Sequence, residues 1–284
     1  MRILIIGANG MLGKDLLLAW TQDEIVPATS RDADIRDLEQ VRHLISKVRP
    51  DWVVLTAAYT DVDGSEKNPE LAFAVNGEGT KNVACAAEEF GAKLFYVSTD
   101  YLFDGTATAP IEPQHAIAPL NVYGQSKAAG EQAVHENHQA WCIARTSWLF
   151  GAHGTSFPEK ILRAAETRPE LTVVADQIGS PTFTRDLAVA IRELVRADAR
   201  GIVNITNSGS CSWFDFAREV LRQAGRGNIR VLPITTVQAG RPAKRPAYSV
   251  LSPVSLQKYG IELREWKEAT AAYLQELRAI GKLA

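Results

Sequence analysis

Tyr123 and Lys127 form the pair whose residue types and spacing point most directly to chemistry. Of the seven tyrosines in the chain, only Tyr123 is followed by a lysine four residues later. On a helix this spacing places both side chains on one face. A nearby ammonium lowers the pKa of a phenol, so Tyr123 is predicted to protonate a carbonyl oxygen while hydride arrives at the carbon. The same spacing also fits an exposed helix pair without a catalytic role.

A short polar segment follows the apolar run Leu94–Ser98. Ser98, Thr99 and Asp100 are expected at the carboxyl end of a strand, where doubly wound sheets bind ligands. A hydroxyl from Ser98 or Thr99 would hydrogen-bond the same carbonyl oxygen as Tyr123 and polarise it. The alternative is that these hydroxyls only satisfy backbone groups at the strand end.

Three glycines, Gly7, Gly10 and Gly13, lie between a short apolar run and a segment with helical periodicity. Glycine lets the backbone turn tightly and approach a pyrophosphate. The N-terminus of the following helix offers unpaired N–H groups and a partial positive charge. The spacing G-x-x-G-x-x-G in this context predicts a dinucleotide-binding loop, with a plain tight turn as the alternative.

The end of the second apolar run, Ala28-Thr29-Ser30-Arg31, bears on which dinucleotide is bound. Dinucleotide-binding folds usually carry an acidic residue near this point, and an acid would repel a 2′-phosphate. Ser30 and Arg31 would instead bind that phosphate. NADPH is therefore favoured over NADH, and Asp34 remains available to the ribose or the adenine. A solvated arginine is the alternative for Arg31.

The segment Gly240–Pro246 places Arg241, Lys244 and Arg245 in one loop that also holds two prolines. Arginine binds a diphosphate in a bidentate manner, and proline restricts the conformations of a loop. The loop is predicted to clamp a diphosphate, with a solvated basic surface loop as the alternative.

These residues need a scaffold to position them, and the first 150 residues alternate apolar runs of strand length with amphipathic runs of helix length. This alternation predicts parallel βαβ units, and the nearly all-apolar strands predict a sheet covered on both faces. The fold class is therefore α/β, a doubly wound parallel sheet of the Rossmann type with a smaller C-terminal substrate-binding domain. The expected strands are Arg2–Ile6, Glu24–Ala28, Trp52–Thr56, Leu94–Ser98, Trp141–Arg145 and Gly201–Thr206, and the expected helices are Met11–Trp20, Asp37–Val48, Glu70–Phe90, Tyr123–Asn137 and Leu263–Leu283.

The pattern changes after about residue 150, where loops lengthen and Pro, Gly and Arg become denser. We predict a dinucleotide-binding domain over residues 1–150, to which a segment at about 183–206 returns. The substrate-binding domain would then comprise residues 151–182 and 207–284.

Composition narrows the class of protein. The 284 residues carry a formal net charge of −2, and 46% of them are hydrophobic, as in globular proteins. Nucleic-acid binders usually carry a basic excess, and no apolar run reaches the about 18 residues of a membrane span. Neither nucleic acid nor membrane is therefore an expected partner. Three widely spaced cysteines, Cys85, Cys142 and Cys211, fit a reduced cytoplasm and show no zinc spacing, so we expect a cytoplasmic protein and assign no metal site.

The chain resembles the extended short-chain dehydrogenase/reductase family, and within it the reductases of nucleotide-linked 4-keto sugars, over nearly its whole length. The combination and order of seven sequence blocks carry the resemblance. These blocks are Gly7–Gly13, Ala57–Asp63, Val97–Gly105, Asn121–Lys127, Arg145–Gly151, Asp176–Thr182 and Gly209–Phe216.

The resemblance implies roles for individual residues. Tyr123 would be the proton donor, Lys127 would hold the nicotinamide ribose, and Thr99 would tune the site. Asp100 and Trp148 would contact the substrate, and the indole would offer a flat apolar face to a deoxyhexose, with a core tryptophan as the alternative. The residues expected to bind the cofactor are Gly7, Gly10, Met11, Leu12, Gly13, Ser30, Arg31, Asp34, Ile35, Ala57, Ala58, Tyr59, Tyr123 and Lys127, and those expected to bind the substrate are Thr99, Asp100, Trp148, Arg241 and Arg245.

The implied activity is reduction of the C4 carbonyl of dTDP-4-dehydro-L-rhamnose with NADPH to give dTDP-L-rhamnose, with NADH as the less favoured cofactor. Two alternatives stay open: a reductase of another dTDP-4-keto-6-deoxy sugar, and a non-catalytic NADP-binding regulatory subunit. Some members of the family bind magnesium at a dimer contact. The sequence assigns no residue to such a site, and it is compatible with a homodimer.

Overall fold

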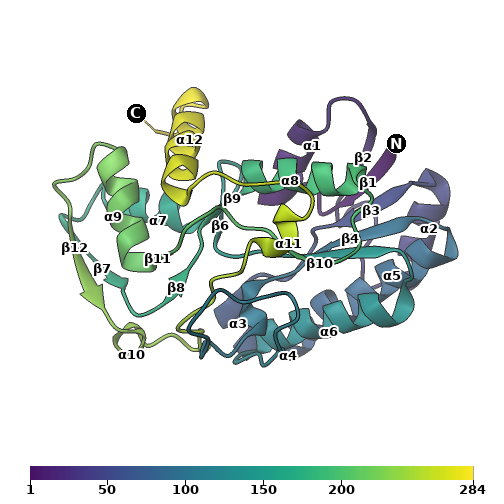
Figure 1. Ribbon diagram of the computed structural model, residues 1–284, viewed down its shortest axis with the longest axis horizontal. Coiled ribbons are helices and arrows are strands. Elements are labelled where there is room, and N and C mark those ends of the chain that lie inside the picture. The colour runs from purple at the N-terminus through teal and green to yellow at the C-terminus, as the bar shows by residue number, and fades with distance from the viewer. Residues whose placement is uncertain (284) are drawn as a thin grey trace.

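Six short apolar strands form one parallel sheet in the larger part of the molecule (Figure 1). The structure is a computed structural model that describes residues 1–283. The strands lie in the order β2 (Glu24–Ala28), β1 (Arg2–Ile6), β3 (Trp52–Leu55), β4 (Lys93–Val97), β5 (Trp141–Arg145) and β10 (Gly201–Asn204), and each neighbouring pair is parallel. The chain reverses its direction of winding between β1 and β3, and ligands of such sheets bind at the carboxyl ends of the strands there.

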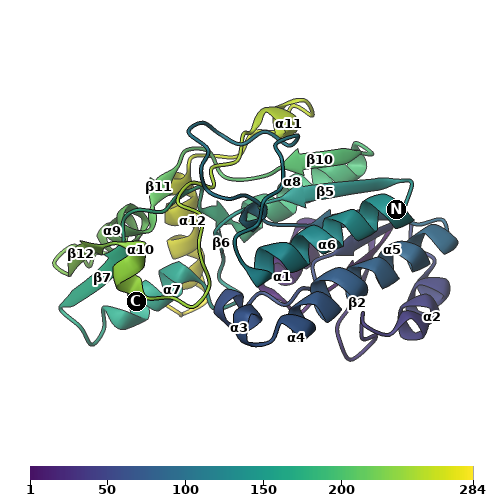
Figure 2. The same cartoon turned by 90° about the horizontal axis from the view of Figure 1, so that it is seen from below.

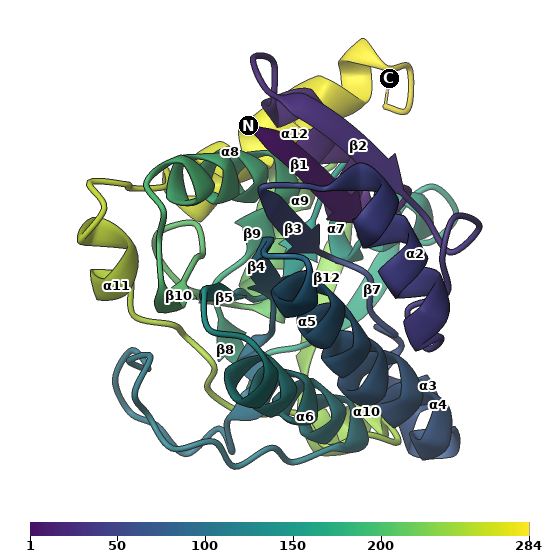
Figure 3. The ribbon, with the colours of Figure 1, turned by 90° about the vertical axis from the view of Figure 1, so that its right-hand side faces the viewer.

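Helices cover both faces of this sheet, which explains why its strands are apolar except at their ends. Along β1, Ile3 and Ile5 belong to the core on one face, whereas Leu4 and Ile6 belong to the core on the other. The first core lies under α1 (Met11–Ala19) and α8 (Thr184–Arg196), and the second under α2 (Leu38–Val48) and α5 (Thr80–Glu89), with α6 (Val122–Asn137) beside α5. Figure 2 shows α6, α5 and α2 across one face, and Figure 3 shows α8 on the opposite face. The predicted doubly wound α/β fold is confirmed.

The smaller part of the molecule consists of short strand pairs and helices, at the left of Figure 1. Aromatic side chains fill its core, where Phe150 contacts Phe183, Phe216 and Tyr273. The strand pairs are β7 (Glu170–Val174) with β12 (Arg230–Ile234), β8 (Ile178–Gly179) with β11 (Cys211–Ser212), and β6 (Leu149–Phe150) with β9 (Thr182–Phe183). The helices are α7 (Phe157–Ala164), α9 (Trp213–Gln223), α10 (Thr236–Ala239) and α12 (Trp266–Ala279).

The helix expected over Glu70–Phe90 is confirmed, since helical backbone runs from Pro69 to Glu89. It is not a regular α-helix throughout: α4 (Pro69–Phe73) leads into a π-helical turn over Ala74–Gly79, which leads into α5. The short helix α3 (Val62–Lys67) precedes it and was not expected. Gly79 lies so close to Ile35 that a Cβ there would be 2.8 Å from Ile35 Cγ1. The widened turn coincides with this tight contact and with the side-chain hydrogen bonds of Asn76, which are described below. Such π-helical turns are frequent at functional sites.

The last part of the chain contacts both parts of the molecule. In α11 (Val254–Gln257), Ser255 Oγ accepts a hydrogen bond of 2.9 Å from the backbone of Asn204, and Leu256 joins the core beneath α1 and α8. Part of the stretch 207–284 thus packs on the main sheet, and the proposed division into domains stays a prediction. The final helix begins at Trp266, later than expected, where Glu265 caps it. Among residues 1–283, no helix is both long and apolar enough to cross a membrane.

Candidate active site

The loop after β1 packs so closely that glycine is required at two of its positions. Gly7 has φ +97°, and a Cβ there would lie 2.6 Å from the backbone nitrogen of Ala57. A Cβ on Gly13 would lie 2.2 Å from the carbonyl oxygen of Gly7. Gly10 is the N-cap of α1 and provides no side-chain cap, so the first N–H groups of this helix stay free to bind an anion.

A cavity of about 850 Å³ opens beside this loop, within the size range of small-molecule sites. It brings the expected cofactor residues and the expected catalytic residues together. The predicted site residues that line it are Gly7, Gly10, Met11, Leu12, Gly13, Ser30, Asp34, Ile35, Ala57, Ala58, Thr99, Asp100, Tyr123, Lys127 and Trp148.

Arg31 does not line this cavity, and its side chain is exposed. Arg36 lies on the cavity wall instead, where its Nε contacts Asp34 Oδ1 at 3.0 Å. The Arg36 guanidinium also lowers the pKa of the Asp34 carboxyl. Sequence reasoning missed Arg36 because it stopped at the strand end, although a second arginine five residues further along was visible.

Tyr59 also lies outside the cavity lining, and its backbone is held by Asn76 of the π-helical turn. Asn76 accepts a hydrogen bond of 2.8 Å from Tyr59 N and donates one of 3.0 Å to Tyr59 O. The same amide donates to Ser126 Oγ at 2.9 Å, and Ser126 Oγ donates to the carbonyl oxygen of Tyr123 at 2.8 Å. Asn76 thus joins the segment after β3 to the helix that carries Tyr123, a link that its sequence position gave no reason to expect.

Tyr123 lies near the start of α6, one turn before Lys127, as the spacing predicts. Its ring packs edge-on against Tyr101, with ring centroids 5.5 Å apart. Burial raises the pKa of Tyr123 to about 12, although a hydrogen bond with the Thr99 side chain lowers it in part. This is opposite to the shift expected from Lys127, because burial disfavours the phenolate and the Asp100 carboxylate raises the pKa of Tyr123 further. Sequence reasoning did not assign Tyr101, which follows Thr99 by two residues.

The Lys127 side chain is buried in the wall of the cavity. Its Nζ donates a hydrogen bond of 2.8 Å to the carbonyl oxygen of Val97, and it lies 4.2 Å from the centroid of the Tyr96 ring. Burial lowers the pKa of Lys127 to about 7, and the Glu131 carboxylate opposes that shift. The anchoring carbonyl is that of the last residue of β4, so Lys127 ties the catalytic helix to the strand that leads into Thr99.

Asp100 is a buried carboxyl group at the same end of β4. Burial raises the pKa of Asp100 to about 7, while hydrogen bonds involving Ser249 and Thr99 lower it in part. Its Oδ2 atom has no hydrogen-bond partner within the described residues. A buried oxygen in this state is available to a ligand that enters the cavity.

The basic loop lies against α3 rather than free in solvent. Arg245 contacts Asp63 through two hydrogen bonds, of 3.0 Å and 2.9 Å, and Arg241 approaches the same carboxylate at 3.6 Å. Both arginines line a second cavity, of about 1330 Å³, which shares Thr60 and Tyr101 with the first. The diphosphate clamp stays a prediction, and Asp63 already neutralises much of the charge on Arg245.

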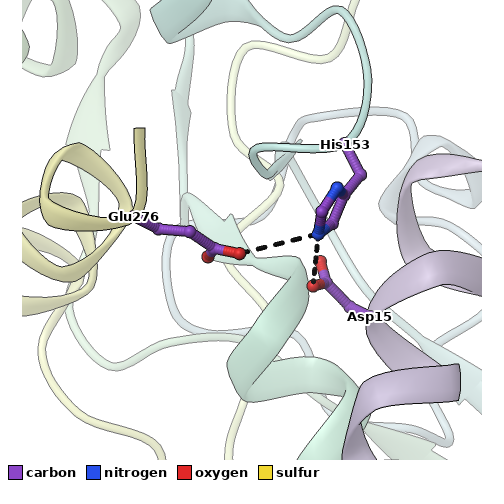
Figure 4. A group of neighbouring side chains, drawn as sticks. All are labelled: Asp15, His153 and Glu276. Carbon is purple, nitrogen blue, oxygen red and sulfur yellow. Dashed lines mark ion pairs between the residues drawn. The ribbon is translucent and has the colours of Figure 1, made fainter. Parts of the chain in front are cut away.

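Asp15 of α1, His153 and Glu276 of α12 form a cluster of titratable side chains (Figure 4). His153 Nε2 lies 3.8 Å from an oxygen of Asp15 and 3.6 Å from an oxygen of Glu276. These three groups have the residue types and proximity of metal ligands. Arg185, however, lies 3.3 Å from Asp15 and 2.6 Å from Glu276 and supplies a cation to both. Sequence reasoning assigned no metal ligand, and separations of more than 100 residues hid this cluster from it.

Comparison with known proteins agrees with this geometry. Residues 1–279 match the family model described as RmlD substrate binding domain. The spore coat polysaccharide biosynthesis protein SpsK of Bacillus subtilis is 40% identical over 277 residues, which cover 97% of each chain. A dTDP-4-keto-6-deoxy-D-glucose reductase of Streptomyces niveus is 38% identical over 272 residues, which cover 94% of each chain.

A solved structure of a relative shows the same fold. The crystal structure of dTDP-4-dehydrorhamnose reductase from Bacillus anthracis in complex with NADP superposes with a TM-score of 0.94 at 41% sequence identity. The match covers 97% of this chain and 99% of the other. Together with the family match over almost every residue, this shows that the chain belongs to the RmlD substrate-binding domain family of extended short-chain reductases.

Proposed function

We propose that the protein reduces the C4 carbonyl of dTDP-4-dehydro-L-rhamnose with NADPH and forms dTDP-L-rhamnose. One observation carries the proposal: Tyr123, Lys127 and Thr99 line the same cavity as the glycine loop of a dinucleotide-binding sheet. Relatives named dTDP-4-dehydrorhamnose reductase, 38–39% identical over 96–99% of this chain, support the same activity. The intact acid–base residues argue for catalysis and against a regulatory subunit that only binds NADP.

The residues present fit NADPH. The Gly7 and Gly13 positions leave no room for a Cβ, so the backbone can approach a pyrophosphate at the free N-terminus of α1. Ser30 and Arg36 would hold the 2′-phosphate, with Arg36 taking the role first expected of Arg31. When bound, NADPH supplies the hydride that reduces the carbonyl carbon.

The side chains around Tyr123 then handle the proton. A pKa of about 12 keeps Tyr123 a phenol at neutral pH, so its proton is present when the carbonyl oxygen becomes basic. The Thr99 hydroxyl, which lies within hydrogen-bond reach of Tyr123, would turn its single proton toward that oxygen. The Lys127 ammonium, one helical turn away, would stabilise the phenolate that remains after proton transfer.

The nucleotide part of the substrate would occupy the second cavity. Because the two cavities share Thr60 and Tyr101, one elongated molecule can extend from Tyr123 to the basic loop. Arg241 is more exposed than Arg245 and is the freer of the two to contact a diphosphate. A cytoplasmic location and a homodimer remain predictions, and no role is proposed for magnesium.

A second candidate is a reductase of another dTDP-4-keto-6-deoxy sugar. The observation that favours this candidate is the Streptomyces niveus relative, which is named for a different 4-keto sugar. The two candidates share every residue role above and differ only in the sugar configuration that the cavity accepts.

The deciding experiment mixes purified protein with dTDP-4-dehydro-L-rhamnose and either NADPH or NADH. Loss of nicotinamide absorbance and formation of dTDP-L-rhamnose are expected, with the higher kcat/KM for NADPH. The Tyr123→Phe variant should bind NADPH normally and lose about 10²–10⁴-fold in kcat, which is the usual contribution of a general acid. Turnover of a different 4-keto sugar alone would favour the second candidate. Tight NADPH binding without turnover of either sugar would refute catalysis.

A further inference from the structure

Trp148 has a strained backbone at the edge of the reaction cavity. Its φ is +48°, in the left-handed region that large side chains rarely adopt. Such a conformation persists only where surrounding contacts hold it, and it is often found at functional sites. The contacts that hold this tryptophan therefore bear on how it meets the substrate.

One face of the Trp148 indole is covered by Trp213, the first residue of α9. The two rings are stacked almost in parallel, with centroids 3.5 Å apart and an angle of 8° between their planes. Trp213 is itself held in place, because its Nε1 donates a hydrogen bond of 3.1 Å to Gln177 Oε1 and its ring packs against Phe157.

Gly179 covers the other face. A Cβ on Gly179 would lie 2.4 Å from Cε2, 2.6 Å from Nε1 and 2.7 Å from Cζ2 of Trp148. Cε2 is bonded to both Nε1 and Cζ2. A Cβ that approached this edge within the plane of the ring would therefore lie nearest to Nε1 or Cζ2. Because it lies nearest to Cε2, Gly179 sits above the plane of the ring. Trp213 already stacks on one face, so the glycine occupies the opposite one.

The backbone on either side of Trp148 is fixed to the same segment as Gly179. Ser147 Oγ donates a hydrogen bond of 2.6 Å to the carbonyl oxygen of Ser180, and Thr182 N donates one of 3.2 Å to the carbonyl oxygen of Trp148. The pairing of β6 with β9 continues this contact. The ring is therefore enclosed on both faces by elements that are themselves anchored.

We propose that Trp213 and Gly179 are positioning residues that clamp Trp148 so that the edge of its indole, not its face, meets the sugar. Trp148 lines the cavity with Tyr123, and Trp213 lines the adjoining one, so the pair forms part of the wall between them. Within residues 1–283, Trp148 Nε1 makes no hydrogen bond, which leaves an N–H donor for a hydroxyl oxygen of the hexose. This inference rests on the proposed function and differs from the stacking role that the resemblance implies.

The first test compares Trp213→Leu, Trp213→Phe and Gly179→Ala by steady-state kinetics. Trp213→Leu should raise KM for the nucleotide sugar by about 2- to 10-fold, the range that one aromatic pair supplies. Trp213→Phe should recover part of that loss, while Gly179→Ala should raise KM by pressing on the ring from the other side. In each variant the dissociation constant for NADPH should stay unchanged.

A spectroscopic measurement separates positioning from general damage. Two stacked indoles whose rings are rotated relative to each other give a coupled circular-dichroism signal in the ultraviolet, and this signal should vanish in Trp213→Phe and in Trp148→Phe. The matched control is Trp266→Phe, a buried tryptophan of the same aromatic core that is not stacked on Trp148. This control should retain both the signal and the wild-type KM.

The outcomes discriminate between the two proposals. A wild-type protein that reduces no 4-keto sugar would refute the proposed function, and with it the substrate role of the clamp. Wild-type turnover with an unchanged KM in Trp213→Leu, together with loss of the coupled signal, would refute the clamp alone. A KM that rises equally in Trp266→Phe would also overturn it, because the effect would then come from the core.

Discussion

Burial controls the charge of the titratable groups around Tyr123. The pKa of Tyr123 is raised to about 12, the pKa of Lys127 is lowered to about 7, and the pKa of Asp100 is raised to about 7. In each case removal from water is the largest cause, and it favours the neutral form. As pH rises through neutrality, Lys127 therefore loses its charge while Asp100 acquires one, and both changes place less positive charge beside Tyr123.

This coupling predicts the pH dependence of the reaction. The ammonium of Lys127 stabilises the phenolate left by proton transfer, so kcat/KM should fall as pH rises above about 7, by about tenfold for each pH unit. Initial rates from pH 5.5 to 9 at saturating NADPH measure it, with thermal melts to show that the protein stays folded. A rate that is flat up to pH 9 would contradict the role given to Lys127.

Asp100 allows a separate prediction about stability. Its folded-state pKa lies above the unfolded value of 3.8, so the folded state holds the proton more tightly. The resulting stabilisation is complete below pH 4 and is lost as pH rises through about 7. Asp100→Asn cannot ionise, so its melting temperature relative to wild type should increase between pH 5 and pH 8, by about 2–4 °C for each kcal/mol. If the melting temperatures of Asp100→Asn and wild type differed by the same amount at both pH values, the raised pKa of Asp100 would be disproved.

At the scale of elements, the π-helical turn over Ala74–Gly79 connects the cofactor side of the cleft to α6. Its Asn76 contacts the backbone of Tyr59 and the hydroxyl of Ser126 from one buried side chain. A regular α-helix through this segment would change the direction of that side chain. The widened turn is therefore part of how the site is assembled.

Asn76→Ala should leave the polar groups of Tyr59 and Ser126 without these partners. We expect a loss of about 1–3 kcal/mol in the free energy of unfolding, the usual cost of a buried group left unsatisfied, and a higher KM for NADPH. Chemical denaturation and steady-state kinetics measure the two effects. Asn68→Ala is the matched control, because Asn68 makes one long, exposed hydrogen bond of 3.4 Å. Equal losses in both variants would argue against the role of Asn76.

At the scale of the whole molecule, the loop Gly240–Pro246 joins the smaller part to the larger one. Arg245 binds Asp63 of α3, and Asn121, the N-cap of α6, donates a hydrogen bond of 2.7 Å to the carbonyl oxygen of Lys244. The loop thus fixes the wall of the second cavity against the helix that carries Tyr123. Its arginines have unequal environments, since Arg241 is largely exposed.

This inequality predicts different effects from two matched substitutions. Arg245→Met should lower the free energy of unfolding by about 1–3 kcal/mol, because Asp63 loses a partly buried partner. Arg241→Met should change stability by less than about 0.5 kcal/mol, as exposed pairs contribute little, but it should raise KM for the nucleotide sugar if it contacts the diphosphate. Denaturation curves and kinetics on both variants provide the test. Similar stability losses would show that the loop is not anchored through Arg245.

Local sequence pattern was sufficient to predict the sheet, the glycine loop and the Tyr123–Lys127 pair. Glycine spacing and helical periodicity depend only on residues that are close in the sequence, so they can be recognised before the fold is known. The sequence did not show which charged side chains are paired with a distant residue. Arg245 and Asp63 are 182 residues apart, and Arg185 and Glu276 are 91 residues apart. The pKa of Tyr123 also depended on packing, since burial and not the nearby lysine determined its direction. Periodicity is local, whereas desolvation and ion pairing arise only when distant segments meet.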